Sequence, residues 1–352
     1  MRRQHGFFDE DDRLTVLSRM GDPLEKAAAA VDFEGFRPIL DQAFDTETKG
    51  PGGRPRFDPV MMFKILLLQQ WYGISDDAAE YQINDRLSFQ RFLGLGLSDK
   101  VPDAKTIWLF REELTRAGVL DQAFDWFTAQ LEKEGLVTRR GSILDATFVD
   151  APRQRNTRGE NATIKDGQMP AGWDSDGPAA RHRLSQKDLD ARWTIKNTER
   201  HYGYKDHVKV DQDSKLITAH AVTDASVHDS KALIGLVDDN DQVLYADSAY
   251  VGEKLHDQVW GVNPGLVLRI CEKGYRNKSL TEAQKTANAA KSRVRARVEH
   301  VFAEMTTAMG GIVVRSVGIV RARAGCALRD LAYNIRRYET ITRLNLLPKA
   351  EA

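Results

Sequence analysis

The run Ser142–Val149, SILDATFV, decides how the fold is interpreted. Its β-branched and apolar residues are typical of a short strand, whereas Asp145 near its middle is not. A carboxylate inside an apolar strand destabilises the fold unless it is paired, hydrogen-bonded or bound to a metal ion. This run therefore indicates both the start of a β-sheet and a candidate functional residue.

Upstream of this run, from Asp11 to about Gly135, apolar residues recur at helical spacing and cap signals repeat. We therefore predict an all-α domain over residues 1–137. Its expected helices at 76–83, 87–93 and 103–114 have turn spacings compatible with a helix-turn-helix. Recognition of a DNA end is the function that we assign to this domain, although the same apolar residues would form a small core in any case.

A loop is predicted between the first helices, at Lys49–Arg56, because the segment contains three glycines and two prolines. Its cations include Arg54 and Arg56, which are candidate DNA contacts. A basic arm over DNA and a plain loop are both compatible with this composition.

Downstream of Ser142–Val149 the chain becomes polar over about residues 152–200, which we interpret as an insertion. Residues 202–210 then alternate as a strand, and a turn leads to a returning strand at 215–222, so the pair predicts an antiparallel hairpin. The remaining elements are expected to be a helix, a strand, a second strand and a long helix, at 230–237, 242–247, 266–270 and 281–309. A mixed sheet flanked by helices, an α/β fold, follows from this order.

Two further acids stand at places suited to metal binding. Asp247 ends a predicted strand, the edge at which α/β sheets usually bind ligands, and Glu299 lies on the predicted long helix. Taken singly, Asp145 and Asp247 are more often turn or cap residues, and Glu299 is more often an ion-pair partner of neighbouring arginines. Together they fit phosphoryl transfer on DNA, which uses two hard cations held by carboxylates. Crowding and burial should raise the pKa of at least one of these acids.

Four motifs in this order resemble bacterial insertion-sequence transposases of the fifth insertion-sequence group. They are DATFV at Asp145–Val149, YKDH at Tyr204–His207, ADSAYVG at Ala246–Gly252 and RARVEHVF at Arg295–Phe302. The resemblance extends to the helical region and to the tail, through GRPRFDP at Gly53–Pro59, LSFQRFLG at Leu87–Gly94, VPDAKTIW at Val101–Trp108 and LAYNIRR at Leu331–Arg337. It covers almost the whole chain.

The resemblance implies a ribonuclease H-like catalytic domain, here residues 138–345, that uses magnesium or manganese. It implies double-stranded DNA as the partner, both terminal inverted repeats and target DNA, and a homodimer that pairs two transposon ends. It also implies that Asp145, Asp247 and Glu299 are the catalytic, metal-binding triad, and that Arg295 contacts a phosphate. One departure is Thr306, with Thr307, where related sequences place a lysine or arginine.

Other residues are candidate DNA contacts on their own chemistry. Arg293 and Arg297 precede Glu299 in a basic segment. Lys205 is suited either to a phosphate contact or to protection of an edge strand by its charge. Trp193 is suited to stacking on an unpaired base, although burial in a core is the commoner role of a single tryptophan.

Whole-chain properties limit the alternatives. The formal net charge is zero, yet residues 1–50 carry 7 Lys/Arg against 11 Asp/Glu and residues 269–343 carry 16 against 6, so the C-terminal part is the expected phosphate-facing surface. Cys271 and Cys326 have no partners at metal-ligand spacing, which argues against zinc and against a disulfide framework. No apolar run is long enough to span a membrane, so we expect a cytoplasmic, nucleoid-associated bacterial protein.

Two other functions remain open on sequence alone. A metal-dependent nuclease, or an inactive domesticated relative, would share the acids without strand transfer. A helix-turn-helix DNA-binding regulator would leave three acids at metal-ready places unexplained.

Overall fold

The computed structural model describes residue 6 and residues 8–44, 56–173, 177–196, 198–274 and 279–346. The chain divides into two compact units. A helical unit comprises Met1–Leu131, Ala308–Gly310 and Leu328–Ala352, and a sheet unit comprises Glu132–Thr307 and Gly311–Ala327. No helix among the described residues is long and apolar enough to cross a membrane.

The helical unit contains no β-strand within its described residues, as the sequence predicts. Its α-helices are α1 (Asp9–Arg19), α2 (Pro23–Ala30), α3 (Arg37–Asp41), α4 (Pro59–Tyr72), α5 (Asp76–Asp85), α6 (Leu87–Leu93), α7 (Ala104–Ala117) and most of α8 (Val119–Lys133), joined by the C-terminal part of α14 (Ile319–Leu344). Short 3₁₀ helices η1 (Phe33–Phe36) and η2 (Gln42–Phe44) complete the unit.

Helix α4 is the centre of the helical unit's core. Its apolar residues point in all directions, and most of them, including Phe63, Leu66 and Leu67, are fully buried. A helix that is hydrophobic all round is stable only when other elements surround it. The helices around it begin at the predicted cap signals, since Ser75 accepts a hydrogen bond from the Ala78 amide and Asp103 accepts one from the Thr106 amide.

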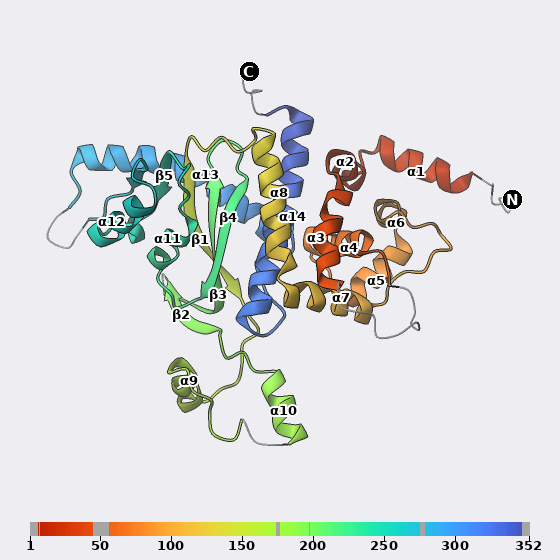
Figure 1. Cartoon of the computed structure of the whole chain (residues 1–352), viewed down its shortest axis with the longest axis horizontal. Coiled ribbons are helices and arrows are strands. Elements are labelled where there is room, and N and C mark those ends of the chain that lie inside the picture. The colour runs from red at the N-terminus through yellow and green to blue at the C-terminus, as the bar shows by residue number, and fades with distance from the viewer. Residues whose placement is uncertain are drawn as a thin grey trace. The chain divides into compact units, whose positions relative to one another are not determined.

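The sheet unit is built on one six-stranded mixed sheet, in the order β2-β3-β1-β5-β6 with β4 paired to β3. Its strands are β1 (Ser142–Asp150), β2 (Arg192–Lys196), β3 (Glu199–Asp211), β4 (Ile217–Asp224), β5 (Val243–Ala246) and β6 (Val267–Ile270). Its remaining elements are α9 (Arg158–Lys165), α10 (Pro178–Ser185), η3 (Asp229–Lys231), α11 (Leu233–Leu236), η4 (Ser248–Tyr250), α12 (Glu253–Val262), α13 (Glu282–Thr307) and the start of α14. Figure 1 shows the strands side by side, with α9 and α10 outside the sheet.

Most predicted elements of this unit are confirmed. The hairpin of β3 and β4 is antiparallel, with Lys205 opposite Thr223, and β1 pairs antiparallel with β3 but parallel with β5. Two details differ from expectation. The helix expected at 230–237 is a 3₁₀ turn followed by the short helix α11, and the polar insertion contains two helices and the unforeseen strand β2.

Side chains alternate between the two faces of β1, as in any strand. Leu144 belongs to a core with Leu233 of α11 and Val259 of α12. Val149 belongs to a second core on the opposite face, with Ala322 and Cys326 of α14. Asp145 has the same parity as Val149, so it faces the side of the sheet on which α13 and the start of α14 lie.

Gly203 marks the closest approach of two backbones in the sheet. Its φ is +148°, and a Cβ there would lie 2.2 Å from the Val149 carbonyl oxygen and 2.7 Å from the Ala151 nitrogen. Both are backbone atoms, one in β1 and one in the residue that follows it, so neither is free to move aside. Only glycine fits this position.

Gly203→Ala is expected to destabilise the protein by more than about 3 kcal/mol, because backbone strain and a steric clash add at one buried site. Urea unfolding followed by circular dichroism measures the change. Gly159→Ala, in α9 where no contact is closer than 4.0 Å, is the matched control and should be neutral or slightly stabilising. Equal stability of the two variants would contradict the close approach.

His207 is a fully buried histidine on β3, with Nε2 2.9 Å from the Thr223 hydroxyl oxygen. Burial lowers the pKa of His207 to about 4, against a smaller raising effect of Asp229. The folded protein therefore keeps this imidazole neutral at pH values at which the unfolded chain binds a proton. Stability should fall as the pH drops from about 6.5 to about 4 and should change no further through this group below that range.

We expect His207→Gln to remove this contribution, which amounts to about 3 kcal/mol over the full range. The measurement is the free energy of unfolding of wild type and variant at several pH values between 7 and 4. As the pH falls, the free energy of unfolding of wild type should decrease steadily relative to that of the variant. A difference independent of pH would show that His207 has the same pKa in the folded and the unfolded protein, and would contradict the effect of burial.

Candidate functional site

Asp145 and Asp247 lie at neighbouring positions of the sheet. Strands β1 and β5 run parallel, with Ser142 opposite Leu244 and Ile143 opposite Tyr245. Extending this register by two residues places Asp145 beside Asp247, just beyond the last residue of β5. Because adjacent strands are about 4.8 Å apart, the two carboxylates are close neighbours.

Local hydrogen bonds orient both carboxylates. The Oδ1 atom of Asp145 accepts a hydrogen bond from the Ala146 amide at 2.8 Å, and Oδ1 of Asp247 accepts one from the Ala249 amide at 2.7 Å. Asp247 is thereby the N-cap of η4. The same residue thus caps a helix and stands at the end of β5, so the two interpretations of Asp247 do not exclude each other. At each aspartate one oxygen is fixed by the backbone, and Oδ2 points elsewhere.

Arg295 supplies the cation of this cluster. Helix α13 packs against β1 and β5, and it places Nη2 of Arg295 3.1 Å from Oδ2 of Asp145. Each of these side chains is about four-fifths buried, with exposed fractions of 20% and 23%. Sequence reasoning placed Arg295 near the acids, but its direct ion pair with Asp145 appears only in the structure.

The electrostatics follow from this arrangement. Burial raises the pKa of Asp145, Arg295 lowers it, and the nearby carboxylate of Asp247 raises it. The expectation that at least one acid of the cluster has a raised pKa is therefore confirmed for Asp145. Desolvation contributes more to this shift than repulsion between the acids does.

Tyr250 is a site residue to which sequence reasoning assigned no role. Its side chain is 1% exposed, and its hydroxyl oxygen has no hydrogen-bond partner among the described residues. Burial and the charges of Asp229, Asp145 and Asp247 all raise its pKa, so the hydroxyl stays protonated and can donate a hydrogen bond. The signal in the sequence was its position in the motif Ala246–Gly252, three residues after Asp247.

Glu299 is not joined to the two aspartates by any recorded contact. It lies one helical turn after Arg295 on α13, its side chain is exposed, and no described residue forms a hydrogen bond or an ion pair with it. The structure thus brings together Asp145, Asp247 and Arg295. It leaves Glu299 at the solvent-facing margin of the same helix.

Lys205 is engaged within the protein. Its ammonium donates at 2.7 Å to both the Val227 carbonyl and Asp229. Edge-strand protection is wrong as an explanation, because β3 pairs with β1, β2 and β4 and is therefore an interior strand. A phosphate contact by Lys205 requires its pair with Asp229 to open.

Trp193 is not a core residue, contrary to the commoner expectation for a single tryptophan. It lies on β2, which pairs only with β3 among the described strands, and the residue is 43% exposed. It packs against Tyr202 with ring centroids 5.0 Å apart, and the Arg153 guanidinium lies 5.8 Å from its centroid. Its exposed position arises because β2 belongs to the insertion rather than to the core of the sheet.

The other predicted cations differ in their surroundings. Arg293 is exposed on α13, whereas Nη1 of Arg297 donates to the Gln212 carbonyl at 2.5 Å and lies 3.4 Å from Asp213. Arg54 lies outside the described residues. Arg56 belongs to the helical unit, where its guanidinium lies 4.8 Å from the centroid of the Phe44 ring.

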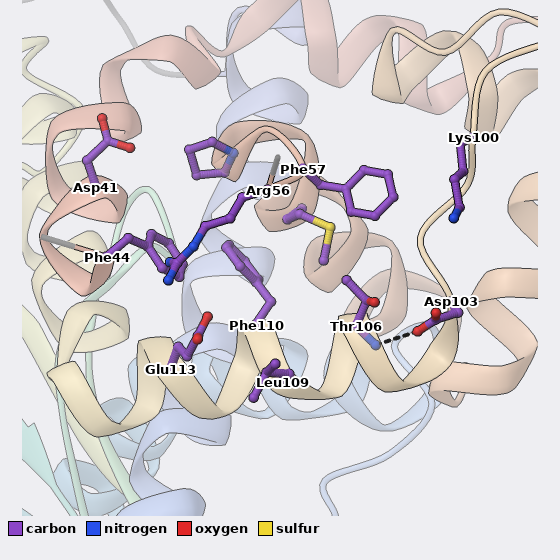
Figure 2. Close-up of a pocket in the computed structure, with 12 residues that line it drawn as sticks. Asp41, Phe44, Arg56, Phe57, Lys100, Asp103, Thr106, Leu109, Phe110 and Glu113 are labelled. Atoms are coloured by element: carbon purple, nitrogen blue, oxygen red, sulfur yellow. Dashed lines mark hydrogen bonds between the residues drawn. The ribbon is translucent and has the colours of Figure 1, made fainter. Parts of the chain in front are cut away.

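Arg56 lines a cavity of about 380 Å³ in the helical unit. Figure 2 shows Phe44 and Phe110 beside Arg56 at one end and Phe57 and Lys100 toward the other. The rings of Phe44 and Phe110 stack with centroids 5.4 Å apart. This cavity was not foreseen, because its walls come from segments distant in sequence.

The donor set of the sheet site fits a hard divalent cation. Such ions take oxygen ligands, and carboxylates are the strongest that a protein offers. Oδ2 of Asp247 accepts no hydrogen bond from a described residue, and Oδ2 of Asp145 is held only by Arg295. Two fixed aspartates with one oxygen each turned away from the backbone are suited to holding such an ion.

Comparison with known families agrees with this geometry. Residues 12–113 match a family described as Transposase domain (DUF772), and residues 137–335, more than half of the chain, match the Transposase DDE domain family. No solved structure matches. The particular insertion-sequence group remains a prediction. The match favours a transposase over a DNA-binding regulator, and the chain belongs to the DDE transposases of insertion sequences, enzymes that cleave and transfer DNA with divalent metal ions.

Proposed function

We propose that Asp145, Asp247 and Glu299 hold two magnesium or manganese ions, and that the enzyme uses them to cut and join terminal inverted repeats as a homodimer. In this proposal residues 1–137 recognise the DNA end and residues 138–345 carry the chemistry. The observation that carries it is the parallel register of β1 and β5, which sets Asp145 beside Asp247.

Each residue of the site has a distinct task in this proposal. Asp145 and Asp247 bind through Oδ2, because Oδ1 is fixed by a backbone amide in each. Glu299 reaches in from α13, and its exposed, uncommitted carboxylate is free to turn toward the aspartates. Tyr250 donates a hydrogen bond at the same edge. When bound, the ions activate the attacking oxygen and stabilise the leaving oxygen of the phosphodiester.

DNA contacts are proposed from the cations around this edge and from the helical unit. Arg293 and Arg295 on α13 approach phosphates nearest the acids, and Arg297 and Lys205 contribute where their internal pairs open. Trp193 stacks on an unpaired base, which its exposed ring supports. Arg54 and Arg56 are proposed for the DNA end at the helical unit.

We expect Asp145→Asn, Asp247→Asn and Glu299→Gln each to reduce strand cleavage by at least about a hundredfold while end binding stays within about threefold of wild type. Coordination of a catalytic ion and contact with phosphates are separate contributions, and these changes remove only the first. Strand cleavage and end binding are both measured with a labelled duplex that carries the flanking ends of the protein's own gene.

Matched controls are Asp257→Asn, exposed on α12, and Glu282→Gln, exposed at the start of α13. Both should cleave like wild type. If Glu299→Gln also cleaves like wild type, the glutamate is not a ligand and the site consists of the two aspartates alone. Joined products in the same reaction distinguish a transposase from a nuclease that only cuts.

DNA binding should weaken steeply with salt, because the basic C-terminal segment releases counterions from the phosphates that it neutralises. If six phosphates are contacted, the slope of log K against log salt concentration should be about −5. Fluorescence anisotropy with magnesium omitted measures it between 50 and 300 mM salt. A slope near zero would contradict the role of these cations.

A further inference from the structure

We propose that Arg295 is a resident counter-cation of the acid site, which occupies Oδ2 of Asp145 until a divalent metal ion takes that oxygen and then turns to a DNA phosphate. This inference rests on the proposed function. In this inference the metal ion replaces the Arg295 guanidinium at Asp145, and the released guanidinium then binds a DNA phosphate.

The first observation is which oxygen the guanidinium uses. At Asp145, Oδ1 is occupied by the Ala146 amide, so Oδ2 is the oxygen available to a cation. Nη2 of Arg295 lies 3.1 Å from that atom. A metal ion bound through Asp145 and Asp247 would need the same oxygen, so the two cations compete for one position.

The second observation is that this ion pair leaves the guanidinium incompletely satisfied. Nε of Arg295 is buried and has no hydrogen-bond partner among the described residues. Arg91 in the helical unit differs, because its guanidinium donates to Leu14, Ser18, Asp22 and Glu25. Arg295 is held by one ion pair, whereas Arg91 is fixed by several hydrogen bonds. The guanidinium of Arg295 can therefore leave its position more easily.

The third observation is the charge balance of the cluster. Two ionised aspartates and one guanidinium leave a single negative charge, which is tolerable in a site that is largely buried. A divalent ion added while the guanidinium remains would make the cluster of Asp145, Asp247 and Arg295 net positive and would place two cations against the Oδ2 atom of Asp145. Release of Arg295 avoids this repulsion, and α13 already holds its side chain at the edge where a bound phosphate would lie.

Linkage makes the exchange measurable without any cleavage reaction. If the Arg295 guanidinium competes with the metal ion for Asp145, removing the guanidinium must increase the affinity of the site for the metal ion. The increase equals the factor by which the ion pair between Arg295 and Asp145 had weakened metal binding. Arg295→Met keeps the length and the apolar stem of the side chain but removes the charge. We expect its affinity for manganese, used as the probe ion, to exceed that of wild type by about tenfold, within the usual range of couplings between sites.

The experiment is a titration of DNA-free protein with manganese, followed by calorimetry or by electron paramagnetic resonance of the free ion. Arg181→Met, at an exposed arginine on α10 that has no role in the proposed site, is the control and should bind manganese like wild type. Arg295→Gln provides a second variant and should also bind manganese more tightly. Unchanged or weaker binding by both Arg295 variants would overturn the exchange and leave a structural role for the arginine.

Failure of the proposed function has a different signature in the same titration. Asp145→Asn and Asp247→Asn should abolish binding of the probe ion. If wild type binds no manganese, or if these variants bind it unchanged, the metal site itself is wrong and the exchange falls with it. If the aspartates matter but Arg295 does not, only the exchange is wrong.

A second measurement tests where the guanidinium goes. Calcium, which also takes carboxylate oxygens, is added to the duplex-binding assay in place of magnesium. For wild type, calcium should make the salt slope more negative by about one unit, because one further phosphate is neutralised. Arg295→Met should lose this increment, whereas Arg181→Met should keep it. An equal increment in wild type and Arg295→Met would overturn the proposal that Arg295 turns to a phosphate.

Discussion

The parallel pairing of β1 with β5 is the constraint on which the site depends. Ile143 lies opposite Tyr245, and from this register follow both the proximity of Asp145 to Asp247 and the face on which they lie. A shift of one residue would turn Asp145 toward the core of Leu144, Leu233 and Val259. The two cores on opposite faces of the sheet hold this register, because each fixes one parity of β1 side chains.

Placing two acids at one edge of a largely buried site requires compensation. Backbone amides take one oxygen of each aspartate, and Arg295 takes the second oxygen of Asp145. The pKa of Asp145 is raised nonetheless, which means that desolvation outweighs the partners present. A site in this condition is suited to binding a cation of higher charge, since an ion that satisfies both carboxylates removes the imbalance.

The same edge of the sheet contains groups that the chemistry of the acids alone would not have predicted. The Tyr250 hydroxyl is buried next to three carboxylates, and Lys205 is paired with Asp229 at the neighbouring strand. His207 stays neutral behind them because burial lowers its pKa.

The sequence by itself determined most of the strand and helix pattern, the places of Asp145 in a strand and Asp247 at a strand end, and the family, because period-2 and helical spacing, cap residues and motifs are local signals. It also located Arg295 correctly on the helix of Glu299. Only the tertiary structure decided that Arg295 pairs with Asp145, that Lys205 is held inside by Asp229, that Trp193 is exposed and that Tyr250 is an orphan hydroxyl at the site. Each of these depends on residues brought together from separate elements. Local sequence carries no information about such distances, since strand order, register and burial are properties of the whole packed sheet.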